Sequence, residues 1–318
     1  MQNKVEFYFP GFVRKSVCFT MDDGWLAHDA KFLSIVRPAG IKGTFNLYCV
    51  DRATPDEYRA LYDGYEIANH SKHHPLAFVD GKKYVVSDEP FDPDTSKSYT
   101  EENPVIYKGE VEGLYRYSTS PEDAKPKRWY KFCDAEAYFK FSRESRAEIE
   151  EVFGKGSVKS FVWPYCEQNN ARLFELLCGD GYNSIRKTGP IEDSTDFDLP
   201  ADRMRWSYNA TNRSLLQIME KYESYADDGK LKFFCFGVHA SDFERDDNWC
   251  DLEEFAAKYG NRPGDYYYAA VSDILEYEDA VKALDITETH IVNDSEKDIY
   301  ATVNGEKVVI FKHSKIEI

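Results

Sequence analysis

The chain has 318 residues, a length that suits one large domain or one domain with a small appendage. Its 40 lysines and arginines stand against 57 aspartates and glutamates, and a net charge of −17 argues against nucleic acid or an anionic membrane as a partner. Aromatic residues make up 15% of the sequence, and because acidic disordered chains are poor in aromatics, we expect a globular protein.

Short apolar runs alternate with helical patterns along most of the chain. Strands are predicted at residues 16–20, 42–50, 65–69, 158–163, 183–186 and 232–239. Helices are predicted at residues 28–38, 54–62, 142–153, 170–178 and 212–225. This order indicates an α/β fold, and it leaves open whether the parallel strands form an open sheet or a barrel.

Residues 80–127 break this alternation. They are rich in Pro, Asp, Ser, Lys and Tyr and form a stretch too long for an ordinary connection. Segments of this size usually cover a functional site or are disordered. We expect a polar insertion that covers the site of the main domain, and we find no motif in it that identifies a ligand.

The C-terminal end has a different pattern. A helix is predicted at residues 265–284, and residues 299–303 and 307–313 then alternate apolar and polar positions around Asn304-Gly305. Asn-Gly favours a two-residue hairpin turn. The predicted division is therefore a main domain over residues 1–285 and a β-hairpin appendage over residues 286–318.

Seven cysteines, at positions 18, 49, 133, 166, 178, 235 and 250, are scattered and include no C-x-x-C pair. We interpret them as buried free thiols of a reducing compartment, with a nucleophilic Cys166 as the alternative. No segment approaches the length of a transmembrane helix, and residues 1–10 lack the features of a signal peptide. We expect a cytoplasmic protein, although a leader removed from the sequence stays an alternative.

Two polar segments follow predicted strands directly. Asp22 and Asp23 are adjacent carboxylates, which repel each other unless a cation lies beside them. His70 and His74 are four residues apart, and on one helical turn they would share a face. Asp23 with the two histidines would give a metal three protein ligands and leave a position for water, which is typical of a catalytic site. A solvated turn and a His-rich loop are the simpler alternatives.

Two further strand ends carry candidate residues. The strand predicted over residues 158–163 is followed by Pro164-Tyr165, which places an aromatic residue at the mouth of an α/β fold. The strand over residues 232–239 ends in His239, which is a candidate general acid.

Taken in this order, the four segments resemble motifs of the polysaccharide deacetylases, the NodB-homology domain of carbohydrate esterase family 4. Residues 20–24 resemble T-F-D-D-G, with Met21 in place of Phe, and residues 70–74 match H-S/T-x-x-H, with His73 as an intervening residue. Residues 161–166 resemble F-x-x-P-Y-G, with Cys166 in place of Gly, and residues 238–239 match the end of L-x-H. The resemblance covers roughly residues 10–285.

The resemblance implies a distorted, incomplete (β/α) barrel, to which the small C-terminal β appendage is added. It implies a divalent metal, most often zinc, with Asp23, His70 and His74 as its ligands. Asp22 would be the general base and His239 the general acid. The substrate groove would be shaped by Trp163, Pro164 and Tyr165, and the Tyr165 backbone N–H would contribute to an oxyanion hole.

Two positions depart from the family pattern. Many members carry an arginine two residues before the Pro-Tyr pair, where it holds the base, but this chain has Val162 there. Arg186, at the end of the next predicted strand, could substitute. The family also has an aspartate that tunes the catalytic histidine, and Asp202 is our candidate, with a surface pair to Arg203 or Arg205 as the alternative.

The residues favour metal-assisted hydrolysis, and the resemblance implies that the hydrolase removes N- or O-acetyl groups from a carbohydrate. A non-catalytic carbohydrate-binding protein on the same fold is one alternative. A hydrolase of a non-peptide C–N bond in a small amide is another. The predicted partner is thus an acetylated carbohydrate or a small amide, with neither nucleic acid nor membrane, and the oligomeric state stays open.

Overall fold

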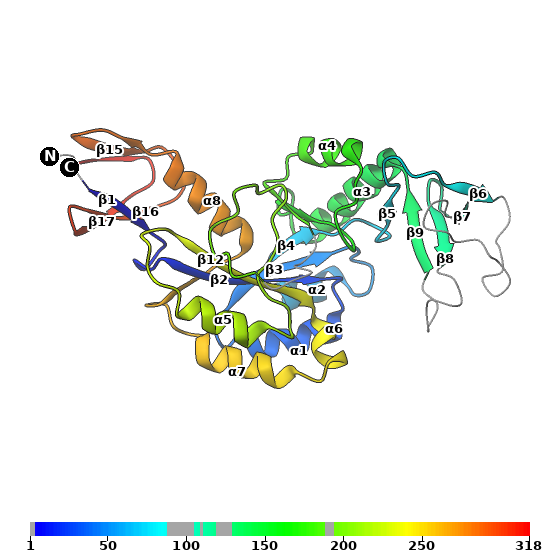
Figure 1. Ribbon diagram of the computed structural model, residues 1–318, viewed down its shortest axis with the longest axis horizontal. Coiled ribbons are helices and arrows are strands. Elements are labelled where there is room, and N and C mark those ends of the chain that lie inside the picture. Colours follow the sequence, from blue (N-terminus) through cyan, green and yellow to red (C-terminus); the bar gives the residue numbers. More distant parts are fainter. Residues whose placement is uncertain (1–3, 88–104, 109–110, 119–128, 188–193) are drawn as a thin grey trace. The chain divides into compact units, whose positions relative to one another are not determined.

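The computed structural model describes all residues except 1–3, 88–104, 109–110, 119–128 and 188–193 (Figure 1). The chain divides into two compact units. Unit 1 comprises residues 1–46, 60–67 and 189–318, and unit 2 comprises residues 47–59 and 68–188.

A curled, half-barrel parallel sheet is the centre of this mixed α/β fold (Figure 1). Its strand order is β11-β10-β4-β3-β2-β12, and β13 also pairs with β2. The predicted incomplete barrel is confirmed, and all six strands predicted for it are present. The strands are β2 (Lys15–Asp22), β3 (Lys42–Leu47), β4 (Glu66–Asn69), β10 (Ser160–Val162), β11 (Ser184–Arg186), β12 (Lys232–His239) and β13 (Tyr266–Tyr268).

Eight helices accompany the sheet in the part of the chain that the structure describes. They are α1 (Leu26–Val36), α2 (Pro55–Tyr62), α3 (Ala135–Phe153), α4 (Ala171–Gly179), α5 (Leu215–Glu223), α6 (Ala240–Arg245), α7 (Trp249–Tyr259) and α8 (Val271–Lys282). In unit 1, Phe32 of α1 packs against Phe19 and Phe236, with ring centroids 4.9 and 6.3 Å away. Burial of such rings is the main stabilising term of an α/β core.

Two predicted helices begin six or seven residues away from their start in the structure, whereas the others differ by three residues or fewer. Helix α3 begins at Ala135 rather than 142, because Asp134 caps it by accepting a hydrogen bond of 2.8 Å from the Ala137 N–H. The segment predicted as one helix over 265–284 begins with β13, since three consecutive tyrosines favour an extended strand. Helices α6 and α7 were not predicted.

The insertion and the residues that flank it contain strands that the sequence analysis did not predict. Strands β5 (Leu76–Ala77), β6 (Val85–Ser87), β7 (Val105–Lys108), β8 (Tyr115–Ser118) and β9 (Trp129–Cys133) form a sheet of order β5-β9-β8-β7-β6 in unit 2. Of these, β6, β7 and β8 lie within residues 80–127, and β5 and β9 lie on either side. Its described strands are short aromatic and β-branched runs, which favour sheet despite the polar composition around them. Much of residues 80–127 lies outside the described residues, and their predicted role as a cover is not tested.

The predicted hairpin around Asn304-Gly305 is present. Strands β16 (Ile299–Val303) and β17 (Glu306–Ile310) pair antiparallel on either side of these two residues, both of which have positive φ. Strand β1 (Val5–Tyr8) extends that sheet, and β14 (Asp285–Ile286), β15 (His290–Asn293) and β18 (Ser314–Glu317) form another. All six strands belong to unit 1, and the division of the chain at residue 285 stays a prediction.

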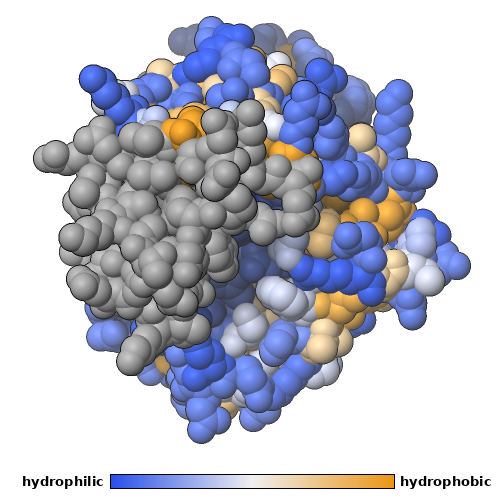
Figure 2. Space-filling model, turned by 90° about the vertical axis from the view of Figure 1, so that its right-hand side faces the viewer, coloured by the Kyte–Doolittle hydropathy of each residue, from blue (hydrophilic) through white to orange (hydrophobic). Residues whose placement is uncertain are grey.

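The surface agrees with the polar composition of the chain. The face in Figure 2 is mostly hydrophilic outside the grey atoms, with scattered apolar patches. No helix among the described residues combines the length and the hydropathy needed to cross a bilayer. All seven cysteines are free thiols, but only Cys18, Cys133 and Cys235 are buried, whereas Cys166 is exposed.

Candidate active site

The carboxyl-terminal ends of β2, β3 and β12 lie side by side in the sheet. Strand β12 pairs with β2 so that His239 lies opposite Asp22, and β3 pairs with β2 so that Asn46 also lies opposite Asp22. The carboxyl ends of parallel strands are where α/β folds place their functional side chains. The register therefore brings both predicted catalytic residues of unit 1 to the same edge.

Asp22 is held by an asparagine that the sequence analysis missed. The Asp22 side chain is almost buried, and its Oδ1 accepts a hydrogen bond of 2.6 Å from the Asn46 amide. The same amide donates to the Thr20 hydroxyl at 2.8 Å, so the position of Asn46 is fixed on two sides. A buried carboxylate oriented in this way can accept a proton from a reacting group. The only sequence signal was the position of Asn46 near the end of the next strand.

Asp23 has a backbone conformation that L-residues rarely adopt. Its φ is 77°, and its Oδ2 accepts a hydrogen bond of 3.3 Å from the Trp25 indole. The same oxygen lies 3.6 Å from Nε2 of His239. Ten described non-glycine residues have positive φ, and five of them lie in the three loops that follow β2, β4 and β10: Asp23, Ser71, His73, His74 and Tyr165. Such strained conformations cluster at functional sites.

In unit 2, the loop after β4 brings His70 and His74 together. Their Nε2 atoms lie 3.2 Å apart. The segment is not the helical turn considered above, because Ser71 and His74 have left-handed backbone conformations. The loop is anchored by Asn69, whose side-chain oxygen accepts the Ser71 N–H at 2.9 Å.

His70 is fully buried and its ring orientation is fixed. Its Nδ1 lies 2.9 Å from the Val162 carbonyl oxygen, which can only accept, so Nδ1 carries the proton and Nε2 presents its lone pair. A hydrogen bond of this kind is typical of metal-ligating histidines.

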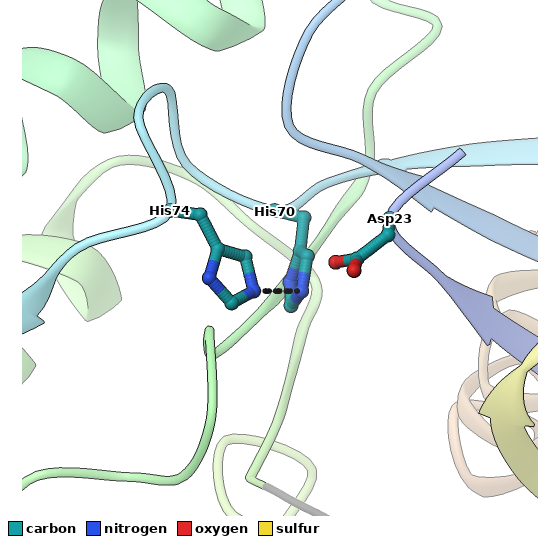
Figure 3. Close-up of side chains that lie close together, drawn as sticks. All are labelled: Asp23, His70 and His74. Atoms are coloured by element: carbon teal, nitrogen blue, oxygen red, sulfur yellow. Dashed lines mark hydrogen bonds between the residues drawn. The ribbon is translucent and has the colours of Figure 1, made fainter. Parts of the chain in front are cut away.

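Asp23, His70 and His74 offer three ligand atoms that all lie within 4.8 Å of one another (Figure 3). The donor set fits zinc, since carboxylate oxygen and imidazole nitrogen are both common zinc ligands. The spacing of the two imidazoles fits as well, because two nitrogen ligands of a tetrahedral zinc are about 3.3 Å apart. We find no other such group of ligands in the described part of the chain.

The residues predicted to shape the substrate groove divide into two classes. Trp163 is fully buried against Tyr138 and Phe161, and Pro164 is also buried, so neither side chain can contact a substrate in this structure. Trp163 follows the last residue of β10, Val162, and its role in shaping a groove stays a prediction. Tyr165 is 39% exposed, and its ring centroid lies 4.5 Å from that of His74.

Arg186 is the largest charged side chain in the interior of unit 2. It is fully buried at the end of β11, and β10 and β11 pair so that Arg186 lies opposite Val162. Residues opposite each other in a parallel pair point to the same face of the sheet. Arg186 thus lies on β11, directly beside Val162 of β10, which is the position where the family pattern has its arginine.

His239 is paired with an aspartate, but not with the predicted one. Its Nδ1 lies 3.0 Å from Oδ2 of Asp242, three residues later in α6. Asp202 lies instead in an exposed turn, where its carboxylate accepts the Met204 N–H at 2.9 Å. Nor does Arg203 pair with Asp202, because its guanidinium binds Asp279. A spacing of three residues at a helix start was the signal that could have identified Asp242.

The electrostatics of His239 follow from its acidic neighbours. Burial disfavours the charged imidazolium, but the hydrogen bond to Asp242 and the charges of Asp22 and Asp23 outweigh it and raise the pKa of His239 to about 9. A cation on Asp23 would oppose part of this effect.

The sequence profile of the family described as polysaccharide deacetylase matches residues 11–177, which is more than half of the chain. The chain belongs to the polysaccharide deacetylase family. The matched segment includes Asp22, Asp23, His70, His74 and Tyr165, whereas Arg186, His239 and Asp242 lie beyond its end.

Several solved structures are also similar to this chain, at low identity. A family 4 carbohydrate esterase from Streptomyces lividans, in complex with acetate, is 15% identical with a TM-score of 0.41 and covers 77% of this chain and 88% of its own. A polysaccharide deacetylase from Bacillus cereus is 15% identical with a TM-score of 0.42 and covers 81% and 92%, respectively. The chitin deacetylase of Colletotrichum lindemuthianum is 16% identical with a TM-score of 0.41 and covers 84% and 87%. No curated protein matches in sequence.

Proposed function

We propose that this member of the polysaccharide deacetylase family is a metal-dependent hydrolase that removes N- or O-acetyl groups from a carbohydrate. The observation that carries the proposal is the set of three ligand atoms from Asp23, His70 and His74 within 4.8 Å of one another. Family membership supports the same reading, since these three residues lie in the matched segment.

Asp23, His70 and His74 would hold a divalent metal, of which zinc fits the donor set best. When bound, the metal supplies Lewis acidity toward the acetyl carbonyl and toward water. The Val162 carbonyl supports this role, because it keeps the proton of His70 on Nδ1 and leaves Nε2 as the ligand atom.

Asp22 would act as the general base. Its carboxylate would take a proton from the attacking water, and the hydrogen bond from Asn46 would keep the other oxygen in place. The backbone N–H of Tyr165 would donate to the oxyanion that develops on the acetyl oxygen. Arg186 would take the place of the arginine that the family carries at the position of Val162, which its register supports.

His239 would act as the general acid. An amide or ester carbon that has accepted water must expel an amine or an alkoxide, and an amine leaves only after it gains a proton. The raised pKa of His239 means that the imidazolium is available at neutral pH, so its Nε2 proton can be donated to the leaving atom. Asp22 and His239 would thus divide the two proton transfers between them.

The test is acetate release from a panel of acetylated oligosaccharides by protein of measured metal content. We expect the metal-loaded protein to release acetate and Asp22→Asn to bind the metal but lose turnover by about 10²–10⁴-fold, the usual worth of a general base. Glycan affinity without acetate release would favour the carbohydrate-binding alternative. Turnover of small amides but of no acetylated glycan would favour the amide alternative.

A further inference from the structure

The seven residues from the last residue of β12 to the end of α6 contain three titratable side chains in contact. His239, Asp242 and Arg245 follow one another at intervals of three residues. His239 is the N-cap of α6, and the other two lie on that helix. Side chains three residues apart on a helix are neighbours, so this spacing places them along one face.

Asp242 makes two hydrogen bonds to His239. Its Oδ2 lies 3.0 Å from the imidazole Nδ1 and 3.1 Å from the His239 backbone nitrogen, whose N–H it accepts. The backbone contact is the capping-box interaction that fixes the start of a helix. One carboxylate oxygen therefore ties both the ring and the backbone of the histidine to α6.

The second oxygen of Asp242 is also occupied. Oδ1 accepts a hydrogen bond from the Arg245 guanidinium, which also contacts Asp246. Asp246 is further held by Arg213, whose Nε lies 2.8 Å from it. The Asp242 carboxylate is mostly buried, so both of its oxygens are held while little of it contacts solvent.

We propose that Asp242 and Arg245 are positioning residues for His239, and that together they replace the aspartate that the sequence pattern led us to seek at position 202. Asp242 holds the proton of the neutral ring on Nδ1 and directs Nε2 toward the reacting atoms. This assignment rests on the proposed function for its catalytic meaning, but the hydrogen bonds exist independently of it.

The orientation has a defined chemical consequence. When the tetrahedral carbon loses its sugar amine or alkoxide, the C–N or C–O bond breaks with its electron pair on the leaving atom. That atom takes the Nε2 proton of the imidazolium, which becomes neutral and keeps its other proton on Nδ1 against Asp242. The neutral His239 ring can then take a new proton at Nε2 for the next turnover.

The substrate test uses leaving groups of different quality. Asp242→Asn keeps an acceptor for the backbone N–H and so should fold, but it removes the negative charge beside the ring. We expect kcat for an acetylated sugar to fall by about 10²-fold or more, with KM and bound metal unchanged, because proton donation is impaired. Turnover of 4-nitrophenyl acetate should change little, since a phenolate leaves without a proton.

Arginine variants provide a matched comparison. Arg245→Gln removes a contact to Asp242 and should lower kcat for the sugar by less than about fivefold, since the guanidinium is exposed. Arg213→Gln removes a contact to Asp246 alone and should leave both activities unchanged. Equal losses on the sugar and on the aryl ester in Asp242→Asn would overturn the assignment, because they would indicate a structural effect.

A second measurement needs no substrate. Nitrogen NMR shifts of His239 should show the Nδ1–H tautomer in the neutral wild type and a mixture of tautomers in Asp242→Asn. A wild-type ring protonated on Nε2 would refute the positioning role even in an active enzyme. If the protein deacetylates nothing, the proposed function fails, and the tautomer still decides whether Asp242 orients the ring.

Discussion

Val162 and Arg186 lie opposite each other at the ends of two adjacent parallel strands, β10 and β11. Both side chains are buried, and neighbouring strands of a sheet generally lie about 4.8 Å apart. An arginine can therefore reach the same region from either strand. We therefore propose that the departure from the family motif at Val162 is a change of strand for the arginine and not the loss of a charge.

An exchange of these two residues tests that interpretation. We predict that Arg186→Val lowers kcat by about 10²-fold. In the proposed mechanism Arg186 holds the base, Asp22, and its removal would leave that buried carboxylate without a compensating positive charge. The double variant Val162→Arg, Arg186→Val should recover part of the loss. The measurement is kcat for acetate release, with unfolding by denaturant as a control for stability. A double variant less active than Arg186→Val alone would contradict the exchange.

Asn46 should affect both stability and activity. Its amide donates to Asp22 and Thr20 in a buried setting, so Asn46→Leu leaves two acceptors without this donor. We expect a loss of about 1–3 kcal/mol in the free energy of unfolding, which is the usual penalty for unsatisfied buried groups. Asn46→Asp should lower kcat, since it sets a second carboxylate beside Asp22, the proposed general base. Unchanged stability in Asn46→Leu would show that the amide is dispensable.

Two histidines of the loop after β4, His73 and His74, allow a matched test of the proposed metal site. We predict that His74→Asn weakens zinc binding, measured by calorimetry, by more than about 100-fold. The loss of a residue that only supports a ligand already lowers metal affinity by about 10–100-fold, and the loss of a ligand should lower it more. His73→Asn is the matched control. His73 also has positive φ, but its ring packs against Phe141 at 4.9 Å, and it is absent from the group of three ligands. Equal effects of the two changes would mean that loop structure, not ligation, controls the affinity.

The titration of His239 predicts a pH dependence of stability in the metal-free protein. Its pKa is raised from 6.5 to about 9, so the folded state binds the proton more tightly than the unfolded state does. The contribution is complete below the unfolded pKa of 6.5 and is lost as the pH rises through about 9. The stability difference between wild type and His239→Gln should therefore be larger at about pH 6 than at about pH 10, by denaturant unfolding. A difference that grows with pH would have the wrong sign.

The residues that could be predicted from the sequence are those fixed by local pattern. Asp22, Asp23 and His239 end apolar runs, and parallel strands carry such ends to one edge of a sheet. The Asn304-Gly305 hairpin follows from the turn preference of two residues. The family motifs singled out Asp23, His70 and His74 as candidate ligands, and their ligand atoms lie within 4.8 Å of one another.

What escaped prediction depends on packing or on contacts between segments. Trp163 adjoins the exposed Tyr165 loop but points inward, which periodicity alone could not show at a strand end. Asp242 was overlooked because the family pattern directed attention upstream to Asp202, whereas the helix start supplies the nearer carboxylate. The strands of the insertion are short, and their aromatic residues are embedded in a polar composition that indicated a loop.

The central claim is that a metal held by Asp23, His70 and His74 is required for deacetylation. Its most direct test is acetate release from acetylated oligosaccharides by the same preparation after chelation, and again after one equivalent of zinc is restored. We predict that chelation abolishes acetate release and that zinc restores it in the wild type but not in His74→Asn. Acetate release that persists at full rate in demonstrably metal-free protein would contradict the account.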